Sequence, residues 1–395
     1  MQKGVQCLGF QASAVEAGIK KPGVLDLGLI YSRTPASVAG VFTRNKVQAA
    51  PVLLSKRRAA SGACRAVVAN AGNANCCTGS QGMADADETT ADVANRLGID
   101  PNEVLVASTG VIGKPLPMEV IRAAVPGLVA GLDARGFDRF ARAIMTTDTV
   151  PKLVQRKGSV KGRDFSLAAA AKGAGMIRPD LATMLCFICT DAAVDSRLLQ
   201  TMLTRAVDST LNRLTIDGDT STNDTVILMA NGASGAVIES AGQVDLFQSL
   251  LDDLLADLAR RLVKDGEGVT KLVELQVLGA ASDRDARRIA DAVAHSPLVK
   301  TAFFGEDANW GRILGAAGRA GAQLEPERVE LLFDDVRMVQ NGMGCGQAAE
   351  DEVTAVMKQS EFKVTLDLHL GKGRASMLTC DFSVDYVRIN ADYRT

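Results

Sequence analysis

Residues 172–191, which read KGAGMIRPDLATMLCFICTD, constrain the fold of this chain more than any other stretch. Two glycines and a proline near the start do not fit one regular element, so a strained loop is expected there. The apolar run at residues 184–188 has the length of a strand that is buried on both faces. Thr183 lies at the junction, where a hydroxyl would be held in place while the peptide before it is distorted.

This junction suits a self-cleaving threonine nucleophile. The Thr183 hydroxyl would attack the carbonyl carbon of Ala182, which turns the peptide into an ester, and water would then hydrolyse that ester. Thr183 would become a new N-terminus whose amine has a pKa of about 7.7 to 8, so this amine could act as general base for its own hydroxyl. The alternative is that Thr183 only caps or packs the start of the strand.

Composition argues against several classes of partner. The 395 residues carry a net charge of −2 and only 4% aromatic residues, which argues against a surface for nucleic acid or for an anionic membrane. No apolar run reaches the length of a membrane span, and the N-terminus lacks the core of a signal peptide. We therefore expect a cytoplasmic protein without membrane or nucleic-acid partners.

The eight cysteines are scattered, as is typical of reduced thiols in the cytosol. Cys186 and Cys189 form a C-x-x-C pair, but on a strand their side chains would point to opposite faces, which argues against a redox or metal site. His295 and His369 are the only histidines, and neither has cysteines or carboxylates clustered around it. We expect no metal site and no histidine-dependent catalytic triad.

Strand-like and helical segments alternate along the chain. Strands are expected at residues 38–45, 52–54, 65–70, 104–108, 184–188, 226–230, 272–278, 299–304, 330–339, 362–370, 376–382 and 384–390, with a strand pair at 160–171. Helices are expected at residues 85–97, 118–132, 137–144, 196–213, 246–263, 282–295 and 351–359. The pattern changes most clearly near Ser282, so we expect the main layers at about 1–281 and a smaller C-terminal domain at about 282–395.

Thr109 and Gly110 directly follow the expected strand at 104–108. The Thr109 hydroxyl and the Gly110 amide could point together at a developing oxyanion. The G-x-x-G-K pattern at residues 110–114 does not qualify as a phosphate loop. Such a loop has four residues between its glycines and a serine or threonine after the lysine, whereas Pro115 follows here.

Four other polar segments are less decisive. Residues 70–75 hold three asparagines, which are either amide donors near a site or side chains that close Asx turns. Residues 145–149 group three hydroxyls around one carboxylate, as either a substrate-binding loop or a polar network at a helix end. Glu267 lies between two glycines, where its carboxylate either reaches a ligand or is an exposed turn residue. Residues 215–226 are polar and turn-rich, with no assigned role.

Six motifs occur together along the chain and identify a family resemblance. They are ASTGVIG, IMTTDT, KGAGMIRPDLATML, DGEGVTK, GEDANWGRI and the terminal RINADYRT. This combination resembles the ornithine acetyltransferase family of arginine biosynthesis, also called glutamate N-acetyltransferases. The resemblance extends from the N-terminal region to the last residue.

The resemblance implies a structure that periodicity alone does not. It implies cleavage between Ala182 and Thr183, which gives an alpha fragment (1–182) and a beta fragment (183–395) that stay associated as a heterotetramer of two copies of each. It also implies an α/β fold with layers in the order helix, sheet, sheet, helix. This architecture is similar to that of N-terminal-nucleophile hydrolases but differently connected. A smaller C-terminal α/β domain completes it, with the last residues reaching back to the active site.

The resemblance also implies which residues form the site. The nucleophile falls on Thr183, and the oxyanion donors fall on Thr109 and Gly110. The substrate-binding positions fall on Thr146, Lys172, Thr183, Glu267, Asn390 and Thr395.

The implied reaction is a ping-pong acetyl transfer. Thr183 would take the acetyl group of N2-acetyl-L-ornithine and pass it to L-glutamate, with no bound cofactor. Whether acetyl-CoA is a second donor stays open. A self-processed aminopeptidase or amidase, which would pass the acyl group to water, is the alternative enzyme. An uncleaved protein that binds a small molecule through its glycine-rich loops is the alternative outside enzymes.

Overall fold

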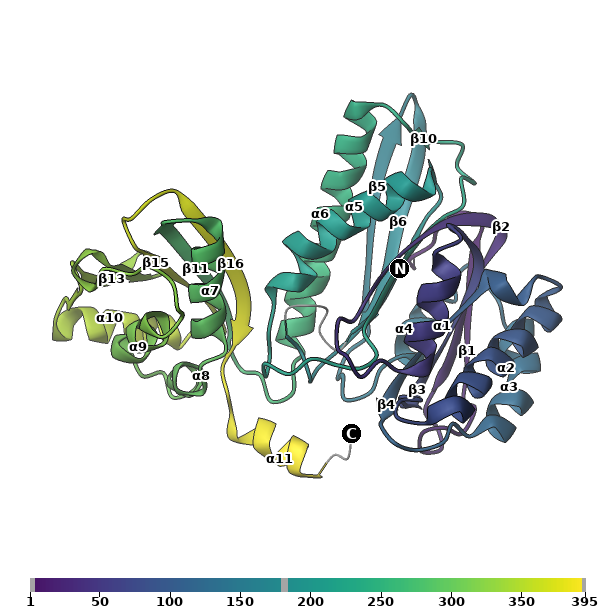
Figure 1. Cartoon of the computed structure of the whole chain (residues 1–395), viewed down its shortest axis with the longest axis horizontal. Coiled ribbons are helices and arrows are strands. Elements are labelled where there is room, and N and C mark those ends of the chain that lie inside the picture. Colours follow the sequence, from purple (N-terminus) through teal and green to yellow (C-terminus); the bar gives the residue numbers. More distant parts are fainter. Residues whose placement is uncertain (1–3, 179–183, 393–395) are drawn as a thin grey trace. The chain divides into compact units, whose positions relative to one another are not determined.

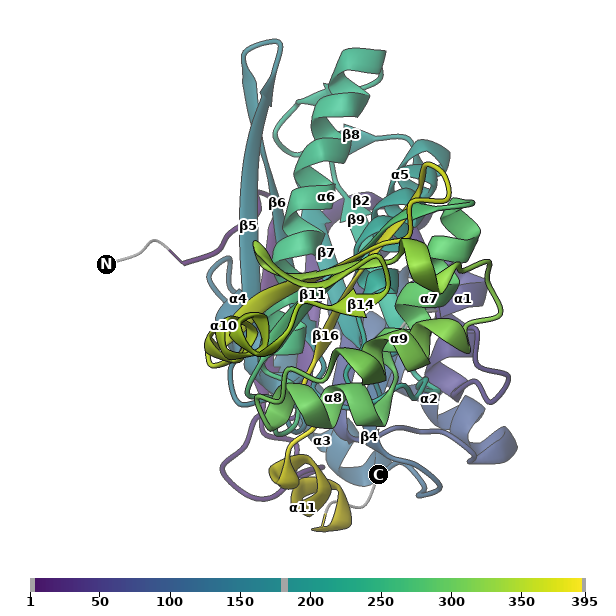
Figure 2. The ribbon, with the colours of Figure 1, turned by 90° about the vertical axis from the view of Figure 1, so that its left-hand side faces the viewer.

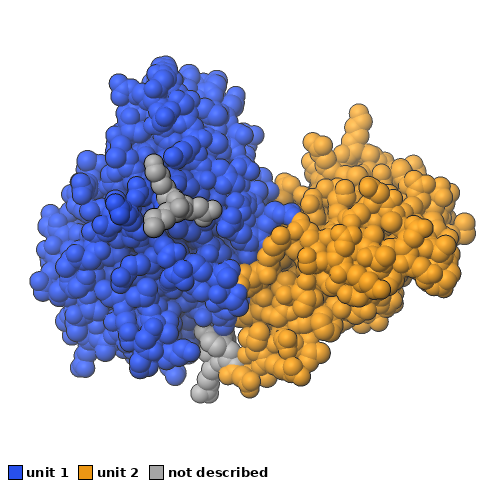
Figure 3. Space-filling model, turned by 180° about the vertical axis from the view of Figure 1, so that it is seen from behind, with its two compact units in different colours: residues 1–212, 219–262, 395 blue, residues 213–218, 263–394 orange. Residues whose placement is uncertain are grey.

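The computed structural model describes residues 4–178 and 184–392, and the chain forms two compact units. Unit 1 takes in the described residues up to Asn212 together with Asp219–Leu262. Unit 2 takes in Arg213–Gly218 and the described residues from Val263 onward. Figure 3 colours the two units separately. Each has its own sheet and its own hydrophobic core.

Unit 1 is built on one sheet, which has eight strands in the described part of the chain. In spatial order these are β4 (Val104–Val111), β3 (Ala63–Asn73), β2 (Leu27–Phe42), β9 (Thr225–Ala230), β7 (Leu185–Thr190), β6 (Arg163–Lys172) and β5 (Lys152–Val160), with β1 (Phe10–Val15) paired to β2. Strand β7 runs parallel to β9 and antiparallel to β6, so both of its edges are hydrogen-bonded. A separate short pair joins β8 (Ala193–Val194) to β10 (Val237–Ile238).

One face of the sheet of unit 1 packs into a single hydrophobic core. Val67 of β3, Phe187 of β7 and Ile227 of β9 all point into the same core cluster. Strand β2 joins the two halves of the sheet, and its pairing with β3 shifts between Tyr31 and Ala36. The inward faces of both halves are therefore buried against one another, together with a short helix, α4 (Phe137–Ala143).

Helices cover the outer face of both halves of this sheet (Figure 1). Beside β2–β4 lie α1 (Ala50–Ala59), α2 (Gly79–Leu97) and α3 (Met118–Ala130). Over the other half lie α5 (Ser196–Ser209) and α6 (Ala241–Lys264). The ring of Phe165 in β6 stacks on that of Phe247 in α6, with centroids 5.9 Å apart. The layers run helix, sheet, sheet, helix, which confirms the predicted layered α/β fold.

Unit 2 has a smaller mixed sheet with helices packed against it (Figure 2). Its strands, in spatial order, are β14 (Met343–Gly344), β13 (Val336–Gln340), β12 (Glu330–Phe333), β15 (Glu361–Asp367), β11 (Leu272–Ala280) and β16 (Gly373–Cys380). Its helices are α7 (Asp283–Ala294), α8 (Pro297–Phe304), α9 (Trp310–Gly318), α10 (Gln347–Met357) and α11 (Val384–Asp392). The Ser282 hydroxyl caps α7 by accepting a hydrogen bond from the Asp285 amide.

Three of the expected strands are helices, so those predictions were wrong. Residues 52–54 lie in α1, residues 299–304 lie in α8, and residues 384–390 lie in α11. Pro51 and Pro297 occupy the first turns of α1 and α8, where a fixed φ and a missing N–H favour a helix. Short apolar runs do not distinguish a strand from a helix by hydrophobicity alone.

The division between the compact units differs from the domain boundary expected near Ser282. Strand β11 pairs parallel with β15 and antiparallel with β16, so it belongs to the sheet of unit 2. The division therefore falls between Leu262 and Val263. The sequence pattern changes at the start of α7, but strand pairing, which decides membership of a sheet, leaves no trace in a single sequence.

Candidate active site

Thr109 and Gly110 lie near the end of β4, where two backbones approach closely. Strand β4 runs parallel to β3 with Gly110 opposite Gly72, and the pairing is irregular there. We call this segment the Thr109–Gly110 turn. Gly110 has a φ of +131°, and a Cβ atom there would lie 2.4 Å from the carbonyl carbon of Gly72. No other residue fits such a position. The Gly110 amide and the buried Thr109 hydroxyl are thus held by rigid backbone.

Lys172, at the end of β6, meets this turn. Its buried ammonium donates a hydrogen bond to Thr109 Oγ1 across 3.3 Å. A hydroxyl that accepts from an ammonium keeps its own hydrogen for a different acceptor. The structure therefore brings together three residues that the sequence predicted for the site, and it orients Thr109 as a donor.

Asp148 organises the loop between α4 and β5. Its Oδ1 accepts hydrogen bonds from Lys152 Nζ at 2.6 Å and from the Gly173 amide at 2.7 Å, and its Oδ2 accepts from the Thr146 amide at 3.0 Å. Burial raises the pKa of Asp148, but the charges of Lys172 and Lys152 outweigh burial and lower it to about 2. Residues 145–149 thus form a polar network, which joins predicted site residue Thr146 to the residue after Lys172.

Lys20 is a further cation near this network. The carboxylate of Asp26 accepts hydrogen bonds from four successive backbone amides, Ala17 to Lys20, and so fixes the loop that carries Lys20. Lys20 Nζ donates to the Met145 carbonyl at 2.9 Å. Burial lowers the pKa of Lys20, and the charge of Lys172 lowers it further. Sequence reasoning missed Lys20, because no local motif marks a lysine that becomes part of a site by folding.

The asparagine-rich loop after β3 uses its amides internally. The Asn75 amide donates to Asn73 Oδ1 at 2.8 Å, which closes an Asx turn, and Asn73 Nδ2 donates to the Pro115 carbonyl at 2.9 Å. Asn70 Nδ2 donates to the Asn73 carbonyl at 2.8 Å. These contacts favour the Asx-turn interpretation of this loop over amide donation to a ligand.

Unit 2 pairs two of the other predicted residues. Asn390 Nδ2, on α11, donates a hydrogen bond to Glu267 Oε2 at 2.8 Å. Glu267 is only 8% exposed, so it is not the exposed turn residue that was one of its two interpretations. The turn before β11 is tied down beside it, because the Ser383 hydroxyl donates to the Gly268 carbonyl at 2.6 Å. Gly268 has a φ of +68° and leaves no space for a Cβ atom beside Tyr386.

Comparison with known proteins identifies the family. The sequence model of the ArgJ family matches residues 11–395. The chain belongs to the ArgJ family. It is 60% identical over 389 residues to the arginine biosynthesis bifunctional protein ArgJ of Geobacter sulfurreducens, which covers 98% of this chain and 99% of that protein. It is 51% identical over 393 residues to the protein of the same name from Syntrophotalea carbinolica, covering 99% of this chain and all of the relative.

A solved structure of the ArgJ family agrees with this assignment. The crystal structure of the arginine biosynthesis bifunctional protein ArgJ from Bacillus halodurans is 40% identical, with a TM-score of 0.50. The match covers 52% of this chain and 98% of that chain. It therefore compares one part of this ArgJ-family fold rather than the whole.

Three of the predicted site residues lie outside the described part of this ArgJ-family chain. They are Ala182, Thr183 and Thr395. The residue after the predicted nucleophile is described: the Met184 amide, just before β7, donates to Asp224 Oδ1 at 3.1 Å. Within residues 4–178 and 184–392, no group of three or more His, Cys, Asp or Glu side chains is arranged to hold a metal ion.

Cys186 and Cys189 lie on β7 as buried free thiols, and burial raises the pKa of Cys186 to about 12. Because burial raises their pKa, these thiols are protonated residues of the sheet core near neutral pH.

None of the described helices has both the length and the apolarity needed to cross a bilayer.

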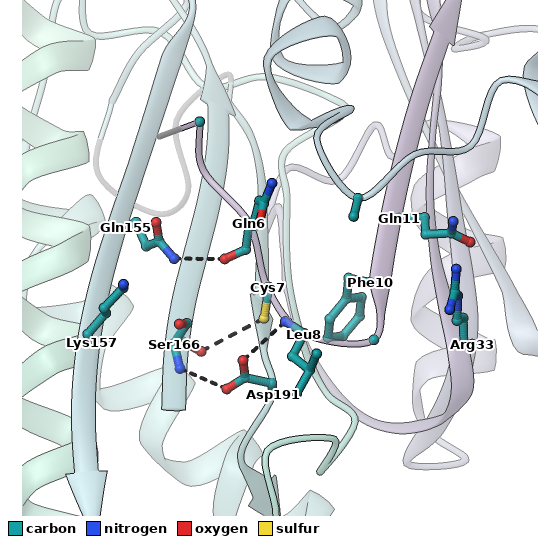
Figure 4. A pocket seen from close by; sticks show the side chains of 13 residues that line it. Gln6, Cys7, Leu8, Phe10, Gln11, Arg33, Gln155, Lys157, Ser166 and Asp191 are labelled. Atoms are coloured by element: carbon teal, nitrogen blue, oxygen red, sulfur yellow. Dashed lines mark hydrogen bonds between the residues drawn. The ribbon is translucent and has the colours of Figure 1, made fainter. Parts of the chain in front are cut away.

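A pocket of about 480 Å³ lies where the N-terminal segment crosses the sheet (Figure 4). Asp191 anchors this segment, because its carboxylate accepts from the Leu8 amide at 3.1 Å and from the Ser166 amide at 2.7 Å. Gln155 Nε2 also donates to the Gln6 carbonyl at 2.7 Å. Of the predicted site residues that the structure describes, none lines this pocket.

Proposed function

We propose that this chain is an acetyltransferase of arginine biosynthesis that moves the acetyl group of N2-acetyl-L-ornithine to L-glutamate. The observation that carries the proposal is 60% identity to an arginine biosynthesis bifunctional protein ArgJ along almost the whole length of both chains. The arrangement of Thr109, Gly110 and Lys172 in unit 1 supports it, because acyl transfer needs donors aimed at an oxyanion.

The reaction has two halves that share one nucleophile, Thr183. Its hydroxyl oxygen bonds to the acetyl carbon of acetylornithine, the C–N bond breaks, and ornithine leaves with the proton on its amine. The glutamate amine then attacks the acetyl ester, and the Thr183 hydroxyl is restored. The Thr109 hydroxyl and the Gly110 amide stabilise both tetrahedral intermediates, and one such donor typically contributes about 3 kcal/mol. The charge of Lys172 would keep the Thr183 amine neutral, so that this amine can accept the hydroxyl proton.

Thr183 becomes the N-terminus by self-cleavage at Ala182. The order of strands in unit 1 supports a stable product. Strands β7 and β9 follow the cleavage site in sequence, yet they lie between β2 and β6, which precede it. The two fragments, 1–182 and 183–395, therefore stay joined by two ladders of backbone hydrogen bonds. We propose that the mature form is a cytoplasmic heterotetramer with two copies of each fragment.

Substrate recognition draws on Thr146, Lys172, Glu267, Asn390 and Thr395. The Glu267 carboxylate, which already accepts one hydrogen bond from Asn390, suits a substrate ammonium. The Thr146 loop is fixed through Asp148 and offers hydroxyls for polar groups of the ligand.

Acetyl-CoA is a second candidate donor. The two curated relatives described above are both named bifunctional. The same acetyl-Thr183 intermediate would form from a thioester, with the thiol of coenzyme A as leaving group, and glutamate would accept the acetyl group as before. No bound cofactor is required for either donor.

The decisive experiment measures cleavage and transfer on the same purified protein. Intact mass and N-terminal sequencing should give two fragments, the second beginning at Thr183. Without glutamate, consumption of acetylornithine should stop at one acetyl group per Thr183, and continuous turnover should need glutamate. Continuous turnover without glutamate would point to a self-processed amidase instead. Thr183→Ala should give a single chain of 41.5 kDa without transfer. An uncleaved wild-type chain that still transfers acetyl groups would overturn the proposal. An assay with acetyl-CoA as the sole donor decides the second activity.

A further inference from the structure

Asn223 and Asp224 lie at the end of the polar segment before β9 to which the sequence assigned no role. Both side chains are buried, and that of Asp224 is fully inaccessible. Polar side chains are buried at a cost that hydrogen bonds must offset. Their distant partners include Ala74, Ser108 directly before Thr109, and Met184 directly after the predicted nucleophile.

Asn223 is tied to the turn that carries the oxyanion donors. Its Nδ2 donates to the Ser108 carbonyl at 2.8 Å and to the Ala74 carbonyl at 2.6 Å. Its Oδ1 accepts a hydrogen bond from the Thr222 hydroxyl at 2.6 Å. Ser108 immediately precedes Thr109, so the amide of Asn223 fixes the peptide that leads into the turn.

Asp224 is tied to the start of β7. Its Oδ1 accepts from the Met184 amide at 3.1 Å, and the next residue, Thr225, donates its amide to the Met184 carbonyl at 3.1 Å. Met184 is thereby held at both its N–H and its C=O. Its nitrogen is covalently bonded to the carbonyl carbon of Thr183.

The carboxyl group of Asp224 is placed as a hydrogen-bond acceptor rather than as a charge. Burial raises the pKa of Asp224 well above its ordinary value, against the opposing effects of the Met184 amide, of the Ser221 and Thr43 hydroxyls and of Lys172. Its Oδ2 is buried and has no hydrogen-bond partner among the described residues. A neutral carboxyl and an amide have the same shape and share one carbonyl acceptor, so asparagine should replace this residue with little loss.

We propose that Asn223 and Asp224 are positioning residues that hold the Met184 end of β7 in register with the Thr109–Gly110 turn. The inference rests on the proposed function, because this register sets the distance from the nucleophile to the oxyanion donors. Acyl transfer is sensitive to that distance: a displacement of about 1 Å can lower the rate about 10²-fold. Neither residue needs to touch the substrate to have this effect.

The test compares four variants of the full chain with the wild type. Asp224→Ala and Asn223→Ala remove the two ties, and Asp224→Asn keeps the acceptor for Met184. Asn231→Ala is the matched control, because Asn231 follows the same strand at its other end and its Nδ2 also donates to a backbone carbonyl, that of Leu8, at 3.1 Å. The measurements are the rate of self-cleavage, kcat and KM per cleaved chain, and hydrogen–deuterium exchange of the peptide that contains Met184.

We expect Asp224→Ala and Asn223→Ala to lower kcat by about 10- to 100-fold with KM within about twofold. Asp224→Asn and Asn231→Ala should stay within about threefold of the wild type. Equal losses in Asp224→Asn and Asp224→Ala would overturn the inference, and so would wild-type kcat in both alanine variants. If the alanine variants do not fold, faster exchange at Met184 in Asp224→Ser, but not in Asp224→Asn, replaces kcat as the readout. A wild type without transferase activity would reject the proposed function, while the exchange data would still test the positioning.

Discussion

The ammonium of Lys172 donates a hydrogen bond to the hydroxyl of Thr109, across 3.3 Å of protein interior. The two residues lie 63 positions apart in sequence and meet because β6 and β4 end at the same site. An ammonium has no acceptor, so the Thr109 hydroxyl must be the acceptor in this pair. Its own hydrogen is left for a third group, which makes the hydroxyl a directed donor.

Removing that donor should slow acetyl transfer. We expect Thr109→Val to lower kcat about 100-fold with little change in KM, because an oxyanion donor acts in the transition state and contributes about 3 kcal/mol. Thr109→Ser keeps the hydroxyl and should stay within about threefold of the wild type. Steady-state kinetics with acetylornithine and glutamate measure both. A Thr109→Val enzyme with unchanged kcat would exclude this hydroxyl from the oxyanion site.

The Gly110 backbone should tolerate no side chain. In Gly110→Ala the new Cβ would lie 2.4 Å from the carbonyl carbon of Gly72 and 2.6 Å from the Asn73 nitrogen, and backbone atoms cannot move aside. We expect a loss of about 3 kcal/mol in the free energy of unfolding, together with loss of activity. Gly113→Ala is the control, since its φ is also positive but no atom lies within 4 Å. It should cost only about 1 kcal/mol in denaturant unfolding.

Asp148 should make stability depend on pH in the acid range. Its pKa is about 2 in the folded chain, below the ordinary value of 3.8, because Lys172 and Lys152 outweigh the effect of burial. A lowered pKa contributes stability that is fully present above pH ~3.8 and is lost as the pH falls through about 2. The contribution is about 2 kcal/mol.

Asp148→Asn tests this contribution. At neutral pH the variant should lose about 3 kcal/mol of unfolding free energy, because Lys152 keeps its buried charge without the carboxylate. The difference between variant and wild type should narrow between pH 4 and pH 2, as measured by urea unfolding. The difference includes the interactions of this carboxylate with Lys172 and Lys20, because both cations lie near it and lose its charge in the variant. A difference that does not change with pH would contradict the assigned charge.

Glu267 should affect binding of the ammonium-bearing substrate. We expect Glu267→Gln to raise KM for acetylornithine about 10- to 100-fold, since a hydrogen bond to a charged group contributes about 1.5 to 3 kcal/mol. Self-cleavage should be unchanged. Glu325→Gln is the control, because Glu325 is a surface carboxylate of the same unit that pairs with Arg328. An unchanged KM in Glu267→Gln would remove this residue from the binding site.

Local signals predicted much of the fold. The helix expected at residues 196–213 is α5, which the side chain of Asp195 caps, and the strand with the C-x-x-C pair is the buried β7. The strand expected at residues 38–45 matches only the second part of β2 (Leu27–Phe42), because Pro35 interrupts the hydrophobic pattern of this strand. That proline lies where the pairing of β2 shifts between Tyr31 and Ala36, which is where a strand tolerates the loss of an N–H donor.

The site residues that were predicted lie in contiguous motifs. The residues that were missed come from distant parts of the sequence and are brought to the site only by folding. Thr109 and Gly110 lie at the end of a readable strand, and the resemblance to a family marked Lys172. Asn223 donates to a carbonyl 115 positions away, and no local pattern reports such a contact. Lys20 is also placed by a loop whose geometry depends on Asp26, a residue that carries no sequence motif of its own.

Strands β7 and β9 lie between β2 and β6 in the sheet. This order changes how the protein can refold after denaturation once the chain has been cleaved. Before cleavage, refolding is unimolecular and independent of protein concentration. After cleavage, the same sheet can form again only when two separate polypeptides meet, so recovery becomes second order and competes with aggregation. A single hydrolysed peptide bond would thus turn a reversibly folding chain into one whose working life is limited by its first complete unfolding.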